Sequence, residues 1–150
     1  MKNKQGIQFG LIDITTDQFA TLESNHEPGN MDFDIKFDVK FRLSRNQHIV
    51  GVYTKYQFEQ KEKMVLVIEC GCHFKLDESY WTEHTEGNML TLEEGLLTHL
   101  IVLTVGTSRG VLHAKKPKWL ENLLLPTINV TSIVTEDMEF DLDAEDDEEE

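Results

Sequence analysis

The residues best suited to metal or redox chemistry lie in one short run, Cys70-Gly71-Cys72-His73. Thiolates and imidazoles are ligands that zinc prefers, and two cysteines can also form a disulfide. The run lies inside an alternating apolar segment that predicts a β-strand, on which Cys70 and Cys72 point to one face and His73 to the other. This geometry favours buried structural thiols, and metal or redox chemistry is the less favoured alternative.

Two further groups could do chemistry. His99 could act as a general base, but no serine or cysteine nucleophile is near it in the sequence, so helix packing or an interface is the better interpretation. The run Ser108-Arg109-Gly110 could bind an anion, but we expect it to close a helix, where the dipole repels anions. No phosphate-binding glycine loop, nucleophile elbow or zinc-helix motif occurs. We therefore expect no catalytic residues, no metal and no cofactor, and a protein that works by binding.

The composition excludes some classes of binding partner. Of the 28 acidic residues, eleven lie in residues 136–150, which leaves 17 acids against 14 bases in the rest of the chain. This nearly neutral body has no basic stripe for phosphates, which argues against nucleic acid and anionic membranes. No apolar run reaches the ~20 residues of a membrane span, and the N-terminus lacks the pattern of a secretory signal. We expect no membrane insertion and a cytoplasmic location.

Alternating apolar residues predict an antiparallel sheet. The four expected strands cover residues 7–19, 31–43, 48–58 and 64–76. The second is the clearest, because residues of one parity, such as Phe33 and Ile35, are apolar and those of the other, such as Asp34 and Lys36, are charged. One solvated face is typical of antiparallel sheets, and short polar links predict hairpins or a meander. The imperfect first strand predicts a bulge or an edge position.

A long helix should follow the sheet. Residues 77–88 are polar and predict a loop, Thr91-Leu92-Glu93-Glu94 predicts a capping box, and Lys115-Lys116-Pro117 should end the helix. The helix carries two apolar stripes, of which a single sheet would cover one. The second stripe predicts a homo-oligomer. We assign four residues to its interface: Leu97, Leu100, Ile101 and Val105.

The predicted fold class is therefore α+β, a four-stranded antiparallel sheet packed on a long helix. One domain should cover residues 1–135, followed by an acidic, disordered tail over residues 136–150. Apolar residues in predicted loops, such as Trp81, Trp119 and the run Leu123-Leu124-Leu125, have no obvious core partner. They indicate either a ligand groove or loops that fold back onto the sheet or onto a neighbouring subunit, and the two are equally favoured.

The order of these features resembles the SecB family of export chaperones. Four strands are followed by a helix that ends in Thr107-Ser108-Arg109-Gly110, then by Leu125-Pro126 and Ile128-Asn129-Val130, so the resemblance covers approximately residues 31–134. It implies an ATP-independent homotetramer, a dimer of dimers, that holds unfolded preprotein in apolar grooves. The residues assigned to client binding are Tyr56, Phe58, Phe74, Trp81, Trp119, Leu123, Leu124 and Leu125.

The resemblance also implies delivery of preprotein to the translocase motor through acidic residues on the sheet, for which Asp34, Asp38 and Glu69 are the counterparts. The chain departs from the family after Asn129, where a second full helix is usual and only residues 130–140 precede the acidic run. The link that follows the helix, over residues 113–125, is also longer and more basic than in the family. This departure favours a specialised client.

Three other functions stay open. The chain could be a chaperone dedicated to one partner, such as an antitoxin. It could be an acyl thioesterase of the hot-dog type, although that fold places its helix after an early strand and the chain shows no carboxylate with a supporting base. It could also carry a lipid or another apolar small molecule.

Overall fold

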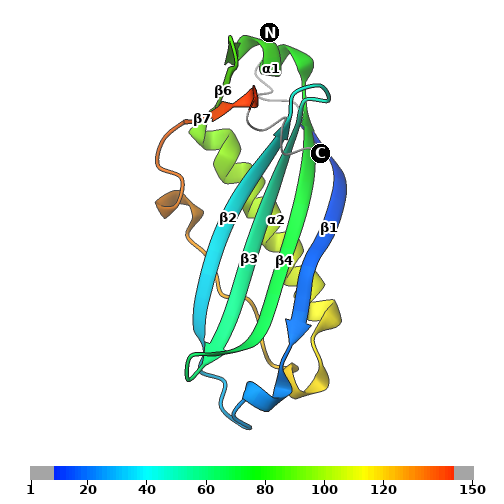
Figure 1. The fold of residues 1–150 in the computed structure, drawn as a ribbon, viewed down its shortest axis with the longest axis vertical. Coiled ribbons are helices and arrows are strands. Elements are labelled where there is room, and N and C mark those ends of the chain that lie inside the picture. The colour runs from blue at the N-terminus through cyan, green and yellow to red at the C-terminus, as the bar shows by residue number, and fades with distance from the viewer. Residues whose placement is uncertain (1–8, 144–150) are drawn as a thin grey trace.

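The computed structural model describes residues 9–143, which form an α+β fold (Figure 1). Its main sheet has four antiparallel strands: β1 (Phe9–Thr21), β2 (Asp34–Ser44), β3 (Ile49–Gln60) and β4 (Lys63–Leu76). The strand order is β1-β4-β3-β2, so β2, β3 and β4 form the expected meander and β1 returns to pair with β4. The prediction of a four-stranded antiparallel sheet is confirmed.

The first strand lies at an edge and is irregular, as its broken alternation predicts. The pairing of β1 with β4 shifts register between Leu11 and Asp13 and again between Thr16 and Gln18. β2 is the other edge strand, and its pairing with β3 runs without a shift from Asp34 to Ser44. The two edges of the sheet therefore differ in regularity.

One face of the sheet carries the core, and the long helix lies across it. The inner face of β3 and β4 is fully buried, with Val52, Phe58 and Ile68 among its residues. Helix α2 (Glu94–Lys115) packs on this face against both strands. Figure 1 shows it behind the sheet, crossing it obliquely.

The position of the helix corrects one assignment. The four residues assigned to the subunit interface, Leu97, Leu100, Ile101 and Val105, are buried within the protomer. They belong to the same core cluster as Val50 and Phe74 of the sheet. Leu97, Leu100, Ile101 and Val105 therefore pack inside the protomer, and any contact with a second subunit must involve other residues of α2.

The helix also begins later than expected. Thr91 lies in the short strand β6 (Met89–Leu92), and α2 begins at Glu94. Asp137 Oδ1 accepts a hydrogen bond of 2.9 Å from the Glu94 backbone amide. A carboxylate from the distant C-terminal segment therefore takes the role that the sequence assigned to Thr91, and the capping-box prediction is wrong.

Residues 77–88, predicted as a loop, contain helix α1 (Glu78–Glu83), and β5 (Thr85–Glu86) and β6 follow it. Trp81 of α1 is buried in the core rather than exposed.

The predicted acidic tail begins with regular structure. Strand β7 (Met138–Asp141) pairs with β6 and completes a second, three-stranded sheet of order β5-β6-β7. Phe140 and Leu142 are buried. The domain therefore extends beyond residue 135, which corrects its predicted boundary. The rest of the predicted tail, residues 144–150, lies outside the described residues.

Irregular chain connects α2 to β7. It contains the 3₁₀ turns η2 (Lys118–Leu120) and η3 (Val130–Ser132), and a third turn, η1 (Glu23–Asn25), follows β1. We call residues 116–137 the connector. Five of its apolar residues are buried: Leu120, Leu123, Leu125, Val130 and Val134. The connector therefore forms part of the core although it has little regular structure.

Helix α2 has the length and composition of a membrane span. The core helices of soluble proteins have the same length and composition, and eight of the 22 residues of α2 are buried. The length of α2 is therefore weak evidence for a span.

Candidate functional site

The structure places most of the residues assigned to client binding inside the protein. Tyr56, Phe58 and Phe74 are fully buried on the inner face of the sheet, and Trp81, Leu123 and Leu125 are buried as well. Trp119 is half-buried, and only Leu124 is largely exposed, at 62%. The buried residues among them therefore line no open groove in this conformation. Trp81, Leu123 and Leu125 instead agree with the alternative in which the apolar loops fold back onto the sheet.

The connector covers much of this apolar surface. Tyr56 and Phe58 share a buried cluster with Leu120, Leu123 and Leu125 of the connector. The Tyr56 ring also contacts Phe37 of β2, with 4.8 Å between ring centroids. An aromatic surface suited to apolar polypeptide therefore exists, and the protein's own connector occupies it.

The hydroxyl of Tyr56 is a polar atom without a partner in this cluster. It is buried, and within residues 9–143 no hydrogen-bond partner reaches it. Burial also raises the pKa of Tyr56 to about 12, and Arg109 opposes that shift. A buried polar group without a partner loses the solvation that it has in the unfolded chain.

We therefore expect Tyr56→Phe to keep or raise stability at neutral pH, by up to about 1 kcal/mol, because it removes an unpaired hydroxyl. The pKa of Tyr56 is about 12 in the folded protein and 10 in the unfolded chain, so the unfolded chain releases the proton first. The stability of the wild type should therefore be unaffected by this group below pH 10 and should fall as pH rises from 10 towards 12. The variant should therefore lose less stability over that range. Urea unfolding at pH 7 and pH 11 measures both effects.

Tyr80→Phe is the matched control, because the Tyr80 hydroxyl has partners. It accepts a hydrogen bond of 3.3 Å from the Glu93 amide and lies 3.4 Å from the Glu93 carboxylate. Tyr80→Phe should therefore cost about 1 kcal/mol at pH 7. An equal loss in both variants would mean that Tyr56 has a partner that the structure does not show.

An exposed apolar surface lies along α2 and β1. On α2, Val102 is 50% and Leu103 is 39% exposed, and they lie close to the exposed Gly106. On β1, Leu11 and Ile14 lie on the inner face, because they pair with Phe74 and Cys72, and both are about half exposed. We call these four apolar residues, Leu11, Ile14, Val102 and Leu103, the α2–β1 surface.

Contacts at both ends of α2 hold it close to β1. The ring of Phe9 meets His99 at 5.5 Å, edge to face, and Lys115 Nζ lies 5.9 Å from the ring centre of Phe19. His99 therefore packs against an aromatic ring, as its helical position suggested. Both ends of β1 therefore contact α2.

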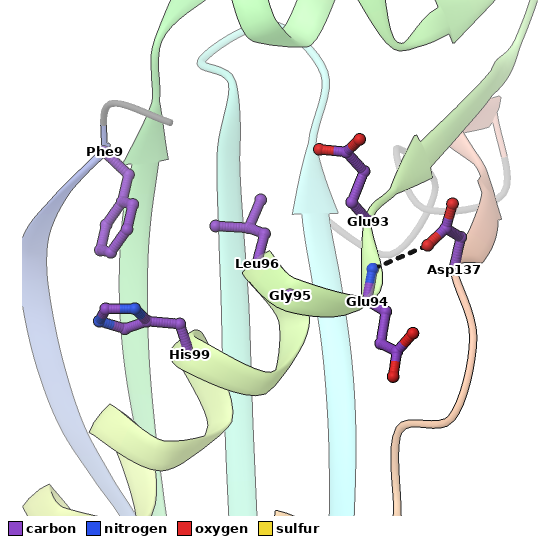
Figure 2. A pocket seen from close by; sticks show the side chains of 7 residues that line it. All are labelled: Phe9, Glu93, Glu94, Gly95, Leu96, His99 and Asp137. Atoms are coloured by element: carbon purple, nitrogen blue, oxygen red, sulfur yellow. Dashed lines mark hydrogen bonds between the residues drawn. The ribbon is translucent and has the colours of Figure 1, made fainter. Parts of the chain in front are cut away.

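A hollow of about 570 Å³ lies at the start of α2. Figure 2 shows the residues that line it. Its apolar side is formed by Phe9 and Leu96, and its rim carries Glu93, Glu94 and Asp137. Asp137 is engaged with the Glu94 amide, and the Glu93 carboxylate lies 3.7 Å from His84 Nε2. Two of the three carboxylates thus contact the helix terminus and the α1 region, and the residues that line the hollow include no serine, threonine or cysteine.

The cysteine run is packed as its spacing predicts. Cys70 and Cys72 are free and buried on the inner face. Burial raises the pKa of the Cys70 thiol, which lowers its reactivity. His73 lies on the outer face, with Nε2 3.3 Å from the Tyr53 hydroxyl. Within residues 9–143, no group of three His, Cys, Asp or Glu residues could hold a metal ion.

Ser108 joins α2 to the sheet rather than closing the helix. Its hydroxyl lies 2.8 Å from Thr54 Oγ1 of β3, and both residues are fully buried. Because α2 continues to Lys115, the prediction that Ser108-Arg109-Gly110 closes the helix is wrong, and the predicted end at Lys115-Lys116-Pro117 is confirmed.

The three acidic residues assigned to the motor contact differ in exposure. Asp34 and Asp38 are exposed on the outer face of β2. Glu69 is buried on the outer face of β4, where its carboxylate lies 3.5 Å from Lys40 Nζ. Glu69 is therefore shielded and partly neutralised, which leaves Asp34 and Asp38 as candidates.

The chain matches no protein-family model, and no curated protein matches it in sequence.

Proposed function

We propose that this protein is an ATP-independent chaperone that assembles from several copies and binds unfolded polypeptide, in the manner that its resemblance to SecB implies. The supporting observation is the α2–β1 surface, because large apolar residues are about half exposed on both of these elements. Soluble proteins rarely leave such a surface uncovered, and it favours contact with another chain.

The geometry of α2 suits contact with a second α2. Gly106 and Gly110 are exposed one and two turns beyond Val102 and Leu103, and a Cβ added at either glycine would meet no atom within 4 Å. Small residues let two helix backbones approach closely while flanking large residues interlock. A twofold contact through this surface would form one dimer of the proposed tetramer, which replaces the interface expected from the sequence.

Client binding would use the aromatic surface under the connector. An unfolded segment with spaced apolar residues could replace Leu123 and Leu125 against Phe58 and its neighbours. Burial of nonpolar area stabilises such a contact by roughly 25 cal/mol per Å², with little demand on client sequence. Leu124, already exposed, would be the first point of contact.

Delivery of preprotein to the translocase motor in the cytoplasm would rest on Asp34 and Asp38. A chaperone dedicated to one partner, such as an antitoxin, is the narrower form of the same proposal. An acyl thioesterase or a carrier of an apolar small molecule is less favoured, because two of the three carboxylates at the Figure 2 hollow already have partners: Asp137 accepts from the Glu94 amide and Glu93 lies near His84.

The direct test is dilution of a denatured protein into buffer with and without this protein, without ATP, while light scattering is recorded. We expect scattering to be delayed at equimolar chain concentration, and size-exclusion chromatography should show a complex with the client. Unchanged aggregation at a fivefold molar excess would contradict the proposal. Turnover of acyl thioesters, or a small molecule retained in native mass spectrometry, would support the other functions.

A further inference from the structure

Tyr56 lies where the sheet, α2 and the connector meet. Its ring packs on Phe37 of β2, and its buried cluster includes Leu112 of α2 and three leucines of the connector. The Tyr56 side chain is fully buried, and its hydroxyl has no hydrogen-bond partner within residues 9–143. Arg109 is near enough to affect the pKa of the hydroxyl, yet it makes no hydrogen bond to it. The hydroxyl therefore keeps a hydrogen-bonding capacity that this conformation does not use.

The connector covers this hydroxyl with side chains, while its nearby carbonyls are engaged elsewhere. The Leu120 carbonyl accepts a hydrogen bond of 2.9 Å from the Leu123 amide, and the Leu123 carbonyl accepts one of 2.8 Å from Lys116 Nζ. Pro126, which follows Leu125, has no amide hydrogen to donate. The connector thus occupies the surface through apolar area and leaves the hydroxyl unpaired.

The connector also shows what kind of chain the surface accepts. Leu123 and Leu125 are buried, whereas Leu124 between them is 62% exposed. Burial of alternate residues is typical of an extended chain. The surface therefore fits an extended polypeptide segment with large apolar side chains at alternate positions. An unfolded segment of this kind carries backbone carbonyls that are not engaged in turns, and each of them needs a donor when it is buried.

We propose that the Tyr56 hydroxyl donates a hydrogen bond to a backbone carbonyl of an extended client segment that replaces the connector. This inference rests on the proposed function, because it assigns a role to one residue of the proposed client surface. Every polypeptide has backbone carbonyls, so the bond adds affinity without a demand on client sequence. An apolar ligand without an acceptor would leave the hydroxyl unpaired, so the contact favours polypeptide over a hydrocarbon.

The hydroxyl favours the client in the exchange with the connector. It is unpaired while the connector covers it and paired when a client carbonyl reaches it, and a buried hydroxyl without a partner is destabilising. Because burial raises the pKa of Tyr56 to about 12, the hydroxyl keeps its proton at neutral pH and acts as the donor. The apolar side chains supply the bulk of the contact, and the hydroxyl makes the two occupants unequal.

Tyr56→Phe tests the bond, because it removes the hydroxyl and keeps the ring. We expect the variant to bind an unfolded client roughly tenfold more weakly than the wild type, while it stays at least as stable. The probe is a reduced and carboxymethylated protein that cannot refold, labelled with a fluorophore, and fluorescence anisotropy measures its Kd. A purely structural role of the hydroxyl would not lower affinity at unchanged stability.

Tyr80→Phe is the matched control for this measurement. Tyr80 belongs to the other core cluster, and its hydroxyl accepts a hydrogen bond of 3.3 Å from the Glu93 amide. The control should therefore lose stability and keep the wild-type Kd for the client. An equal loss of affinity in Tyr80→Phe and Tyr56→Phe would overturn the proposal, because the loss would then be general.

Tyr56→Phe also removes the unpaired group from the connector-covered state, so this effect must be separated from a bond to the client. Leu123→Ala/Leu125→Ala weakens the packing of the connector on the surface. In this background Tyr56→Phe should still weaken client binding at least about threefold. No difference there means that the hydroxyl acts only through the connector, which overturns the proposal. If circular dichroism shows that the alanine variant is unfolded, Lys116→Met provides the weakened connector, because it removes the bond to the Leu123 carbonyl.

The wild type and the variant separate this inference from the proposed function. If the wild type binds no unfolded client, the proposed function is wrong and the role of Tyr56 falls with it. If the wild type binds the client and Tyr56→Phe binds it equally well, the chaperone proposal stands and the role of Tyr56 is wrong. A loss of stability in Tyr56→Phe as large as in Tyr80→Phe also overturns the inference, since the hydroxyl would already have a partner in the free protein.

Discussion

Replacement of Val102 and Leu103 together by glutamate is expected to halve the mass of the assembled protein while each chain stays folded. Both side chains are 39–50% exposed, so charge there is tolerated in a single chain. In the proposed α2 contact the four carboxylates of a dimer would be forced together without partners, and burial of an unpaired charge costs several kcal/mol. Sedimentation at micromolar concentration measures the mass.

The conservative variant Val102→Leu/Leu103→Met is the matched control, because it keeps the surface apolar and should keep the wild-type mass. An unchanged mass in the glutamate variant would remove α2 from the subunit contact. If aggregation protection were lost at unchanged mass, the α2–β1 surface would instead be where the client binds. The measurement thus separates self-association from client binding, which one exposed apolar surface cannot do by itself.

The sheet could be predicted from the sequence because one physical signal dominates it. The alternation of Phe33 to Leu43 with charged residues fixes both the strand and its inner face, and the structure reproduces that division. The broken alternation of β1 likewise marks an edge strand with register shifts. The local pattern of apolar and charged residues is sufficient to predict a strand that has one exposed face and one buried face.

The orientation of α2 could not be predicted in the same way. The sequence shows two apolar stripes, but the structure buries much of both in one broad face that also contains Thr104 and Ser108. Both residues are polar, so the sequence alone does not assign them to a buried face. In the helix their hydroxyls donate to the carbonyls of Leu100 and Thr104, so they can be buried at little cost. Apolar character alone therefore placed the interface on the wrong side.

The prediction of the client-binding residues was wrong for a different reason. The residues that cover them in the fold lie far away along the chain. Trp81, Leu123 and Leu125 lack local partners, and only the fold brings the connector over the sheet. The same holds for β6 and β7, which pair across nearly fifty residues, and for Asp137 at the start of α2. A lone Phe140 within acidic sequence gives no periodic signal, although it is buried.

Gly71→Val is expected to destabilise the fold by about 2–3 kcal/mol, because the outer face of β4 has no room for a side chain there. A Cβ at residue 71 would lie 2.6 Å from Tyr53 Cε2 and 2.8 Å from Thr15 Oγ1. The Tyr53 ring lies against Gly71 and is held by the His73 contact and by Arg42, whose guanidinium lies 5.6 Å from the ring centre. The ring cannot move without losing these contacts.

A second substitution tests whether the clash with Tyr53 causes the loss of stability, or whether β4 tolerates no side chain at residue 71 for another reason. Tyr53→Ala removes the nearer obstacle, so Gly71→Val should cost less in that background, with a coupling of about 1 kcal/mol or more in urea unfolding. Gly10→Ala is the control, since a Cβ there meets nothing within 4 Å and should change stability little. Additive losses in the double variant would show that Tyr53 is not what excludes the side chain. A strong coupling would instead show that the Tyr53 ring, which packs on the backbone of Gly71, is what excludes a side chain at that position.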